Sequence, residues 1–228
     1  MEKISFLHYF FLFIEFSGVV VLSFSMFRIP LSLHKVNISI ITLTMAAVSF
    51  LVRDVMDGFN YSVLLVIAVY ILLLVILQRL PILYASLICL TGYLAAGVIQ
   101  VALGILGINL GITSSEQLSE LFLHYTILGV LTAIICFLIS YIFHLKKLGF
   151  MFVVKRFKGK SALKGYNFFL AALLLTVVVI IQLAVLSFKI NSVHLYVLLG
   201  MLCMFIIAIY SAYQHNRTHL REKYKRAA

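Results

Sequence analysis

The sequence predicts an all-α integral membrane protein, a polytopic bundle of about seven transmembrane helices with the N-terminus outside and the C-terminus in the cytoplasm. Three observations predict this fold. Of the 228 residues, 64% are hydrophobic and 11% are charged, whereas soluble domains have roughly 45–50% and 25%. The apolar residues form stretches of about 20, the length of helix that crosses the hydrocarbon core of a bilayer. The basic residues lie between these stretches.

Seven stretches have the length and hydropathy of a span. They run approximately from Ser5 to Phe27, Val36 to Val52, Tyr61 to Gln78, Pro81 to Val101, Leu121 to His144, Tyr166 to Phe188 and His194 to Tyr213. Pro30 and Pro81 lie at or just before span starts, where a missing N–H costs little. Residues 1–213 are therefore predicted to form the bundle, and residues 214–228 a basic, helical cytoplasmic tail.

The orientation follows from the distribution of charge, because cytoplasmic loops carry an excess of lysine and arginine. With the N-terminus outside, all but three of the 18 basic residues fall on the inner side. The exceptions are Lys3, Arg53 and Lys189. A model with six or eight spans would place the basic loop 146–164 and the basic tail on opposite sides, so the charge distribution favours seven.

The end of the fourth span is the least defined boundary. Apolar character continues to Ile112, while Gly104, Gly107 and Gly111 lower the helix propensity of this stretch. We therefore expect residues 102–120 to form an extracellular segment that lies against the membrane. Two interpretations remain open: an ordinary interfacial loop, or an interfacial or re-entrant surface for a lipophilic ligand.

Glu15 is the first candidate functional residue, since it lies near the middle of the first span. An acid at that depth is costly and should face the interior of the bundle. It is either a proton-linked switch or ligand anchor, or a neutral carboxyl group that hydrogen-bonds between helices. The candidate partners are Thr91, Gln100 and Gln182.

Histidines near the outer ends of spans suggest a second site. His8, His124 and His194 could cluster with Glu116 and Glu120 into a rim that senses pH or binds a ligand. The alternative is that these are ordinary interfacial histidines. The rim histidines show no paired metal-binding spacing on one helix, so no metal site is predicted there.

The loop after the fifth span mixes basic and aromatic residues, which predicts contact with an anionic inner leaflet. Docking of a cytoplasmic partner is the alternative. Because this membrane role explains the net charge of +11, nucleic acid is not an expected partner. The predicted lipid-contacting residues are Lys146, Lys147, Lys155, Arg156, Lys158, Lys160 and Lys164.

Catalytic signatures are missing from the sequence. It has no Walker loop, no GxSxG, no HExxH and no pair of carboxylates within one span. We therefore expect no enzymatic activity, no catalytic residues and no cofactor.

Two segments suggest a family resemblance: FMFVVKRFKGK before the sixth span and YSAYQHNRTHLREKYKR after the seventh. With seven spans and a last span that continues into a charged cytoplasmic helix, the chain resembles the membrane sensor module of Agr-type sensor histidine kinases of Gram-positive bacteria. The family's kinase portion has no counterpart in these 228 residues. The resemblance therefore implies a sensor module in a bacterial cytoplasmic membrane that acts through a partner.

Three functions follow as hypotheses. In the first, a receptor-like module binds a lipophilic or peptide ligand outside, changes helix packing near Glu15 and signals to a cytoplasmic partner. In the second, the chain is a transport component in which Glu15 couples protons or recognises substrate. In the third, it is a non-catalytic scaffold in a membrane complex. The ligand and the oligomeric state stay open.

Overall fold

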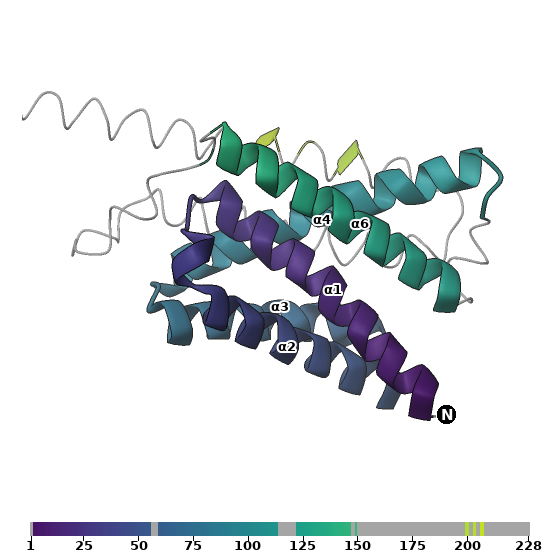
Figure 1. Ribbon diagram of the computed structural model, residues 1–228, viewed down its shortest axis with the longest axis horizontal. Coiled ribbons are helices and arrows are strands. Elements are labelled where there is room, and N and C mark those ends of the chain that lie inside the picture. Colours follow the sequence, from purple (N-terminus) through teal and green to yellow (C-terminus); the bar gives the residue numbers. More distant parts are fainter. Residues whose placement is uncertain are drawn as a thin grey trace, which may run out of the picture.

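The computed structural model describes residues 2–55, 59–113 and 122–146, together with the single positions 149, 199, 200, 203, 206 and 207. This part of the chain is almost entirely helical and contains no strand. Two short helical turns, η1 (Leu31–Leu33) and the π-helical η2 (Leu51–Val55), flank the second long helix. The long helices of this part (Figure 1) are α1 (Glu2–Met26), α2 (Lys35–Phe50), α3 (Phe59–Gln78), α4 (Ile82–Asn109) and α6 (Phe122–Leu145).

Four helices are long and apolar enough to cross a membrane, which confirms the all-helical class and its apolar helices for the described residues. The total of seven spans and the orientation stay predictions. The sixth and seventh predicted spans, residues 166–188 and 194–213, fall almost wholly outside the described residues. The four spanning segments are Leu7–Met26, Lys35–Arg53, Tyr84–Asn109 and Thr126–Leu145, and α3 adds the shorter apolar segment Ser62–Gln78.

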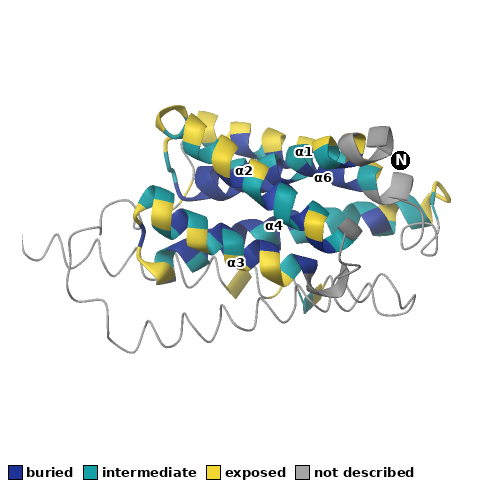
Figure 2. Ribbon diagram, turned by 90° about the horizontal axis from the view of Figure 1, so that it is seen from below, coloured by how far each residue is buried: buried dark blue, intermediate teal, exposed yellow. Residues whose placement is uncertain are grey.

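Helix α1 occupies the centre of the bundle. It contacts α2, α4 and α6, while α3 packs between α2 and α4. The facing surfaces of the helices are buried (Figure 2), and Phe24, Tyr70 and Leu94 in this core have no exposed surface. Large apolar side chains also point outward, such as Leu72 on α3 and Tyr141 on α6. A bundle with an apolar core and an apolar outer surface matches a lipid environment.

Glycines set the distance between α1 and its neighbours. A Cβ atom at Gly18 of α1 would lie 2.8 Å from the Cα atom of Ala133 on α6. A Cβ atom at Gly92 of α4 would overlap the Ser23 side chain of α1. Small residues allow such close approach between membrane helices, where dispersion contacts replace the hydrophobic effect as the main attraction.

An arginine in the left-handed conformation follows both α1 and α3. Arg28 and Arg79 each have φ of 52°, a conformation usually given to glycine because it strains other side chains. At the end of α1, the Arg28 N–H donates to Ser25 O (3.2 Å) and the Ile29 N–H to Phe24 O (2.9 Å). This is the Schellman pattern, which satisfies the last carbonyls of a helix.

These turns lie at one end of the bundle, which we call the basic end and define by Arg28, Lys35, Arg79 and Lys146. Arg28 shares a cavity with His144 near the end of α6, and the side-chain amide of Asn37 in the first turn of α2 donates to Leu77 O near the end of α3 (3.4 Å). The predicted orientation assigns this end to the cytoplasm.

Helix α4 continues past its predicted end at Val101 and stops at Asn109. The expectation that glycines would end the helix near residue 102 is wrong for Gly104 and Gly107, because this part of α4 packs beside α6 and tertiary contacts outweigh propensity. Gly111, with φ of 67°, does end it through a second Schellman pattern. Residues 114–120 of the predicted interfacial segment lie outside the described part.

The contact between α1 and α6 predicts a stability effect. Changing Gly18 to Ala should lower the free energy of unfolding by about 1–3 kcal/mol, because the added methyl group meets the backbone of α6 rather than a movable side chain. Denaturation of the purified protein in micelles measures this. The control is Gly200→Ala, since a Cβ atom there meets no atom of the described residues within 4 Å; equal effects of the two changes would contradict the prediction.

Candidate functional site

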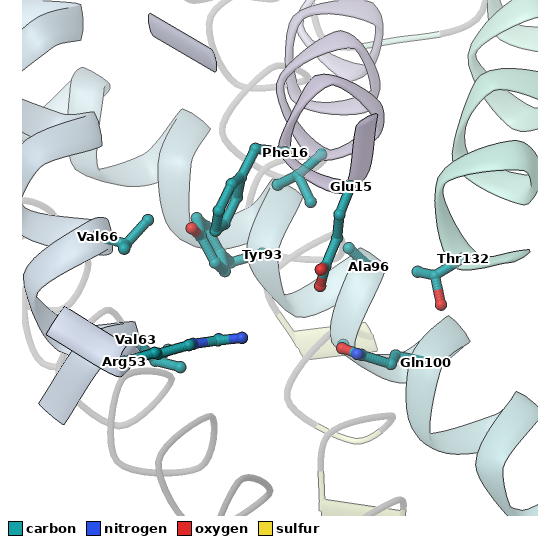
Figure 3. Close-up of a pocket in the computed structure, with 11 residues that line it drawn as sticks. Glu15, Phe16, Arg53, Val63, Val66, Tyr93, Ala96, Gln100 and Thr132 are labelled. Carbon is teal, nitrogen blue, oxygen red and sulfur yellow. The ribbon is translucent and has the colours of Figure 1, made fainter. Parts of the chain in front are cut away.

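Glu15 lines a polar cavity where the described helices meet. The cavity has a volume of about 80 Å³, enough for two or three waters or a solute of a few non-hydrogen atoms, since one water takes ~30 Å³ of liquid. Its side chains come from α1, η2, α3, α4 and α6 (Figure 3). The lining residues are Glu15, Phe16, Val19, Arg53, Val63, Val66, Tyr93, Ala96, Gly97, Gln100 and Thr132.

Helix α6 leaves room for the Glu15 carboxyl group because it has a glycine beside it. A Cβ atom at Gly129 would lie 2.9 Å from Glu15 Oε2. Four residues further along α6, Ala133 lies against Gly18. Gly129 and Ala133 therefore form a small-xxx-small face that places the acid directly beside the α6 backbone. The prediction that Glu15 faces the bundle interior is confirmed.

Arg53 is the main residue that sequence reasoning missed, since it was assigned to the outer loop. The π-helical turn η2 extends α2 by five residues and includes Arg53. The guanidinium group faces the same cavity as the Glu15 carboxyl group (Figure 3), and Arg53 Nε donates to Ser62 Oγ over 3.1 Å. The arginine attracts the acid across the cavity when the Glu15 carboxyl group is ionised. Single π-helical turns often occur at functional sites, but hydropathy does not reveal them.

Two hydrogen-bond donors at the cavity lack acceptors. Tyr93 Oη and Gln100 Nε2 are buried and have no partner in the described part of the chain. Both residues line the cavity from α4, one at each side of Ala96 and Gly97. Buried donors without acceptors are rare and costly. The two donors can therefore bind a hydrogen-bond acceptor that enters the cavity.

The predicted partners of Glu15 have different outcomes. Gln100 lines the Glu15 cavity, as predicted. Thr91 does not line it; its hydroxyl donates to Leu87 O (2.6 Å) one turn earlier in α4. Gln182 lies outside the described residues. Thr132, which the sequence did not suggest, lines the cavity, although its hydroxyl donates to Leu128 O (2.8 Å).

The predicted outer rim is described only at His8. This side chain is buried and packs edge-on against Phe50, with ring centroids 6.0 Å apart. His124 lies in α6, but its side chain is outside the described part, as are His194, Glu116 and Glu120. The clustering of these residues stays a prediction.

The predicted lipid-contacting set is described only at Lys146, which is exposed just after α6. The other six residues, Lys147, Lys155, Arg156, Lys158, Lys160 and Lys164, lie outside the described part. Among the described residues, no group of three or more His, Cys, Asp or Glu side chains could hold a metal ion.

A second cavity, here called the apolar groove, lies between the last part of α4 and the first part of α6. Its volume is about 380 Å³, within the ~300–1,000 Å³ of small-molecule sites. Part of the segment 102–120, which was expected to lie against the membrane, thus forms one wall of this groove. The lining residues are Leu103, Gly104, Leu106, Gly107, Leu110, Ile112, Thr113, Ile127, Leu128 and Leu131.

The charges at the polar cavity predict energetic coupling. In a double-mutant cycle, Glu15→Gln and Arg53→Gln should be non-additive by about 1 kcal/mol or more, because the two side chains face one cavity and either single change removes the interaction between them. Unfolding in micelles measures both effects. Glu15→Gln with Arg79→Gln is the control pair, since Arg79 is exposed beyond α3; additivity in both pairs would show that Glu15 and Arg53 act independently.

Comparisons with known proteins add no relative: no family model, no curated protein and no solved structure matches the chain. The resemblance to Agr-type sensors stays a prediction, and the function has to be inferred from the residues of this chain.

Proposed function

We propose that this chain is a multi-pass integral membrane protein that works as a receptor-like module, in which a lipophilic ligand binds the apolar groove and controls the Glu15 cavity. The observation that supports this most is the sharing of one turn of α6 by both cavities. Leu128 and Leu131 line the groove, while Gly129 and Thr132 border the polar cavity.

The shared turn supplies a physical route between the two cavities. A ligand in the groove contacts α4 and α6 and so biases their separation. Because Gly129 lies directly beside the Glu15 carboxyl group, a small shift of α6 changes the space around this acid. Helix shifts of about 1–2 Å are typical of such switches. The ligand acts only through its different affinity for the two packings.

The lining of the two cavities narrows the class of ligand. The groove is bordered by aliphatic side chains and glycines, with Thr113 as the polar exception. It suits an acyl chain or another lipophilic molecule. The polar cavity, with about 80 Å³, is too small for a peptide. We therefore prefer the lipophilic ligand to the peptide alternative.

The remaining parts of the proposal come from the sequence. The orientation predicted from the charge distribution assigns the groove to the outer side of the membrane and the basic end to the cytoplasmic side. The predicted last span and the tail 214–228 would pass the change to a cytoplasmic signalling partner. The resemblance to Agr-type sensors suggests a bacterial cytoplasmic membrane as the location.

Photolabelling tests the groove as a ligand site. Parent protein in liposomes is irradiated with a diazirine-bearing palmitic acid, and we expect adducts to concentrate in residues 103–113 and 127–131. Leu131→Trp should lower their yield about fivefold, because the indole fills the groove. The matched control is Leu138→Trp, an exposed position of α6 that does not line the groove.

The same experiment tests the link to Glu15. Coupling between two sites is reciprocal, so Glu15→Gln should change the adduct yield in the groove while Glu15→Gln protein remains folded. Adducts spread evenly over the outer surfaces of α4 and α6, or a groove yield insensitive to both Leu131→Trp and Glu15→Gln, would contradict the receptor-like proposal.

The transport alternative is supported by the donors of Tyr93 and Gln100, which have no acceptor among the described residues and which, with Glu15 and Arg53, surround a space inside the bundle. It predicts that proteoliposomes containing a pH-sensitive dye acidify in response to a proton gradient. Glu15→Gln should abolish this flux, because an amide cannot exchange the proton. Equal flux in parent, Glu15→Gln and protein-free liposomes would remove the proton-coupled version.

A further inference from the structure

A third cavity lies at the basic end, between the C-terminal turns of α1 and α6. Its volume is about 360 Å³. Three polar residues, Ser25, Arg28 and His144, face it from the two helices. The rest of its wall is apolar and includes Ile29, Leu31 and Phe143.

Two hydrogen-bond donors at this cavity lack acceptors. Ser25 Oγ and Arg28 Nε are both buried without a partner in the described part of the chain. Ser25 is only 8% exposed, so bulk water does not readily serve its hydroxyl group. A buried guanidinium nitrogen and a buried hydroxyl group on the same cavity call for an acceptor with negative charge.

The backbone at Arg28 has a left-handed conformation. Its φ of 52° suits glycine better than other residues, so glycine can replace Arg28 without adding backbone strain. Arg79 has the same φ at the end of α3 but is exposed and does not line this cavity. The two positions have the same backbone conformation and different surroundings.

The basic predicted segment begins beside the cavity. Lys146 follows α6 directly and is exposed. A Cβ atom at Gly149 would lie 2.7 Å from Met26 O and 2.9 Å from Arg28 Cγ, so the chain returns onto the last turn of α1 only a few residues after α6.

We propose that this cavity binds the phosphate of an anionic phospholipid, with Arg28 and Ser25 as hydrogen-bond donors. The shared chemistry is that of a phosphate group, and the lipid is the preferred source for two reasons. The apolar wall formed by Ile29, Leu31 and Phe143 suits the glycerol and upper acyl region. The predicted orientation places the basic end in the inner leaflet, which is rich in anionic lipid. This site is independent of the apolar groove and of the receptor-like function.

Native mass spectrometry of the full-length protein, released from micelles, tests the proposal with phosphatidylglycerol and phosphatidylcholine as probes. Parent protein should retain phosphatidylglycerol in preference to phosphatidylcholine. Arg28→Gly should weaken phosphatidylglycerol binding about tenfold or more, because charge-assisted hydrogen bonds are lost. Arg79→Gly is the matched control and should leave binding unchanged, since glycine fits the left-handed conformation at both positions.

A second variant and a second probe keep the test decisive. Ser25→Ala removes a hydroxyl group without adding bulk, and it should also weaken phosphatidylglycerol binding, by a smaller factor than Arg28→Gly. Inorganic phosphate should compete weakly with the lipid. Equal binding by parent and Arg28→Gly, an equal loss in Arg79→Gly, or tight binding of inorganic phosphate without lipid would overturn the phospholipid site.

Discussion

The close contact between α1 and α6 is the constraint on which the rest of the described structure depends. Gly18 and Ala133 let the two backbones approach to a distance that no larger side chain would permit. One turn earlier in α6, the same close approach places Gly129 beside the Glu15 carboxyl group. Since α1 also contacts α2 and α4, its position relative to α6 determines the shape of the polar cavity.

The polar groups that line this cavity lower the free energy of unfolding, and this cost is an argument that the cavity has a function. Charged side chains in the core lose solvation that their mutual attraction does not always repay, and apolar replacements often stabilise a protein. Tyr93 Oη and Gln100 Nε2 have no acceptor in the described part of the chain, and a buried donor without an acceptor lowers the free energy of unfolding by about 1–3 kcal/mol. A bundle selected only for stability would fill this space with aliphatic side chains. Departures of this kind are expected at functional sites.

Helix α6 connects three features that lie along its length. Near its start, Ile127, Leu128 and Leu131 line the apolar groove. In its middle, Gly129 and Thr132 border the polar cavity. Near its end, Phe143 and His144 line the cavity that contains Arg28. The three features therefore lie at the start, in the middle and near the end of one helix.

The sequence by itself determined the helical class, the long apolar helices, the span starts near Pro30 and Pro81, and the inward direction of Glu15. Hydropathy and the cost of burying an acid suffice for these, because each depends on a residue's own solvation and on its near neighbours in the chain. Of the candidate partners that the sequence suggested, Gln100 lines the same cavity.

Only the tertiary structure decided which side chains meet Glu15. Whether Gln100 or Thr91 faces the acid depends on the rotation of α4 about its axis, and small-residue contacts such as Gly92 with Ser23 fix that rotation. Arg53 reaches the cavity because η2 continues α2 inward, and α4 extends to Asn109 because α6 covers it. These outcomes arise from packing between helices far apart in the sequence, on which local propensity has no bearing.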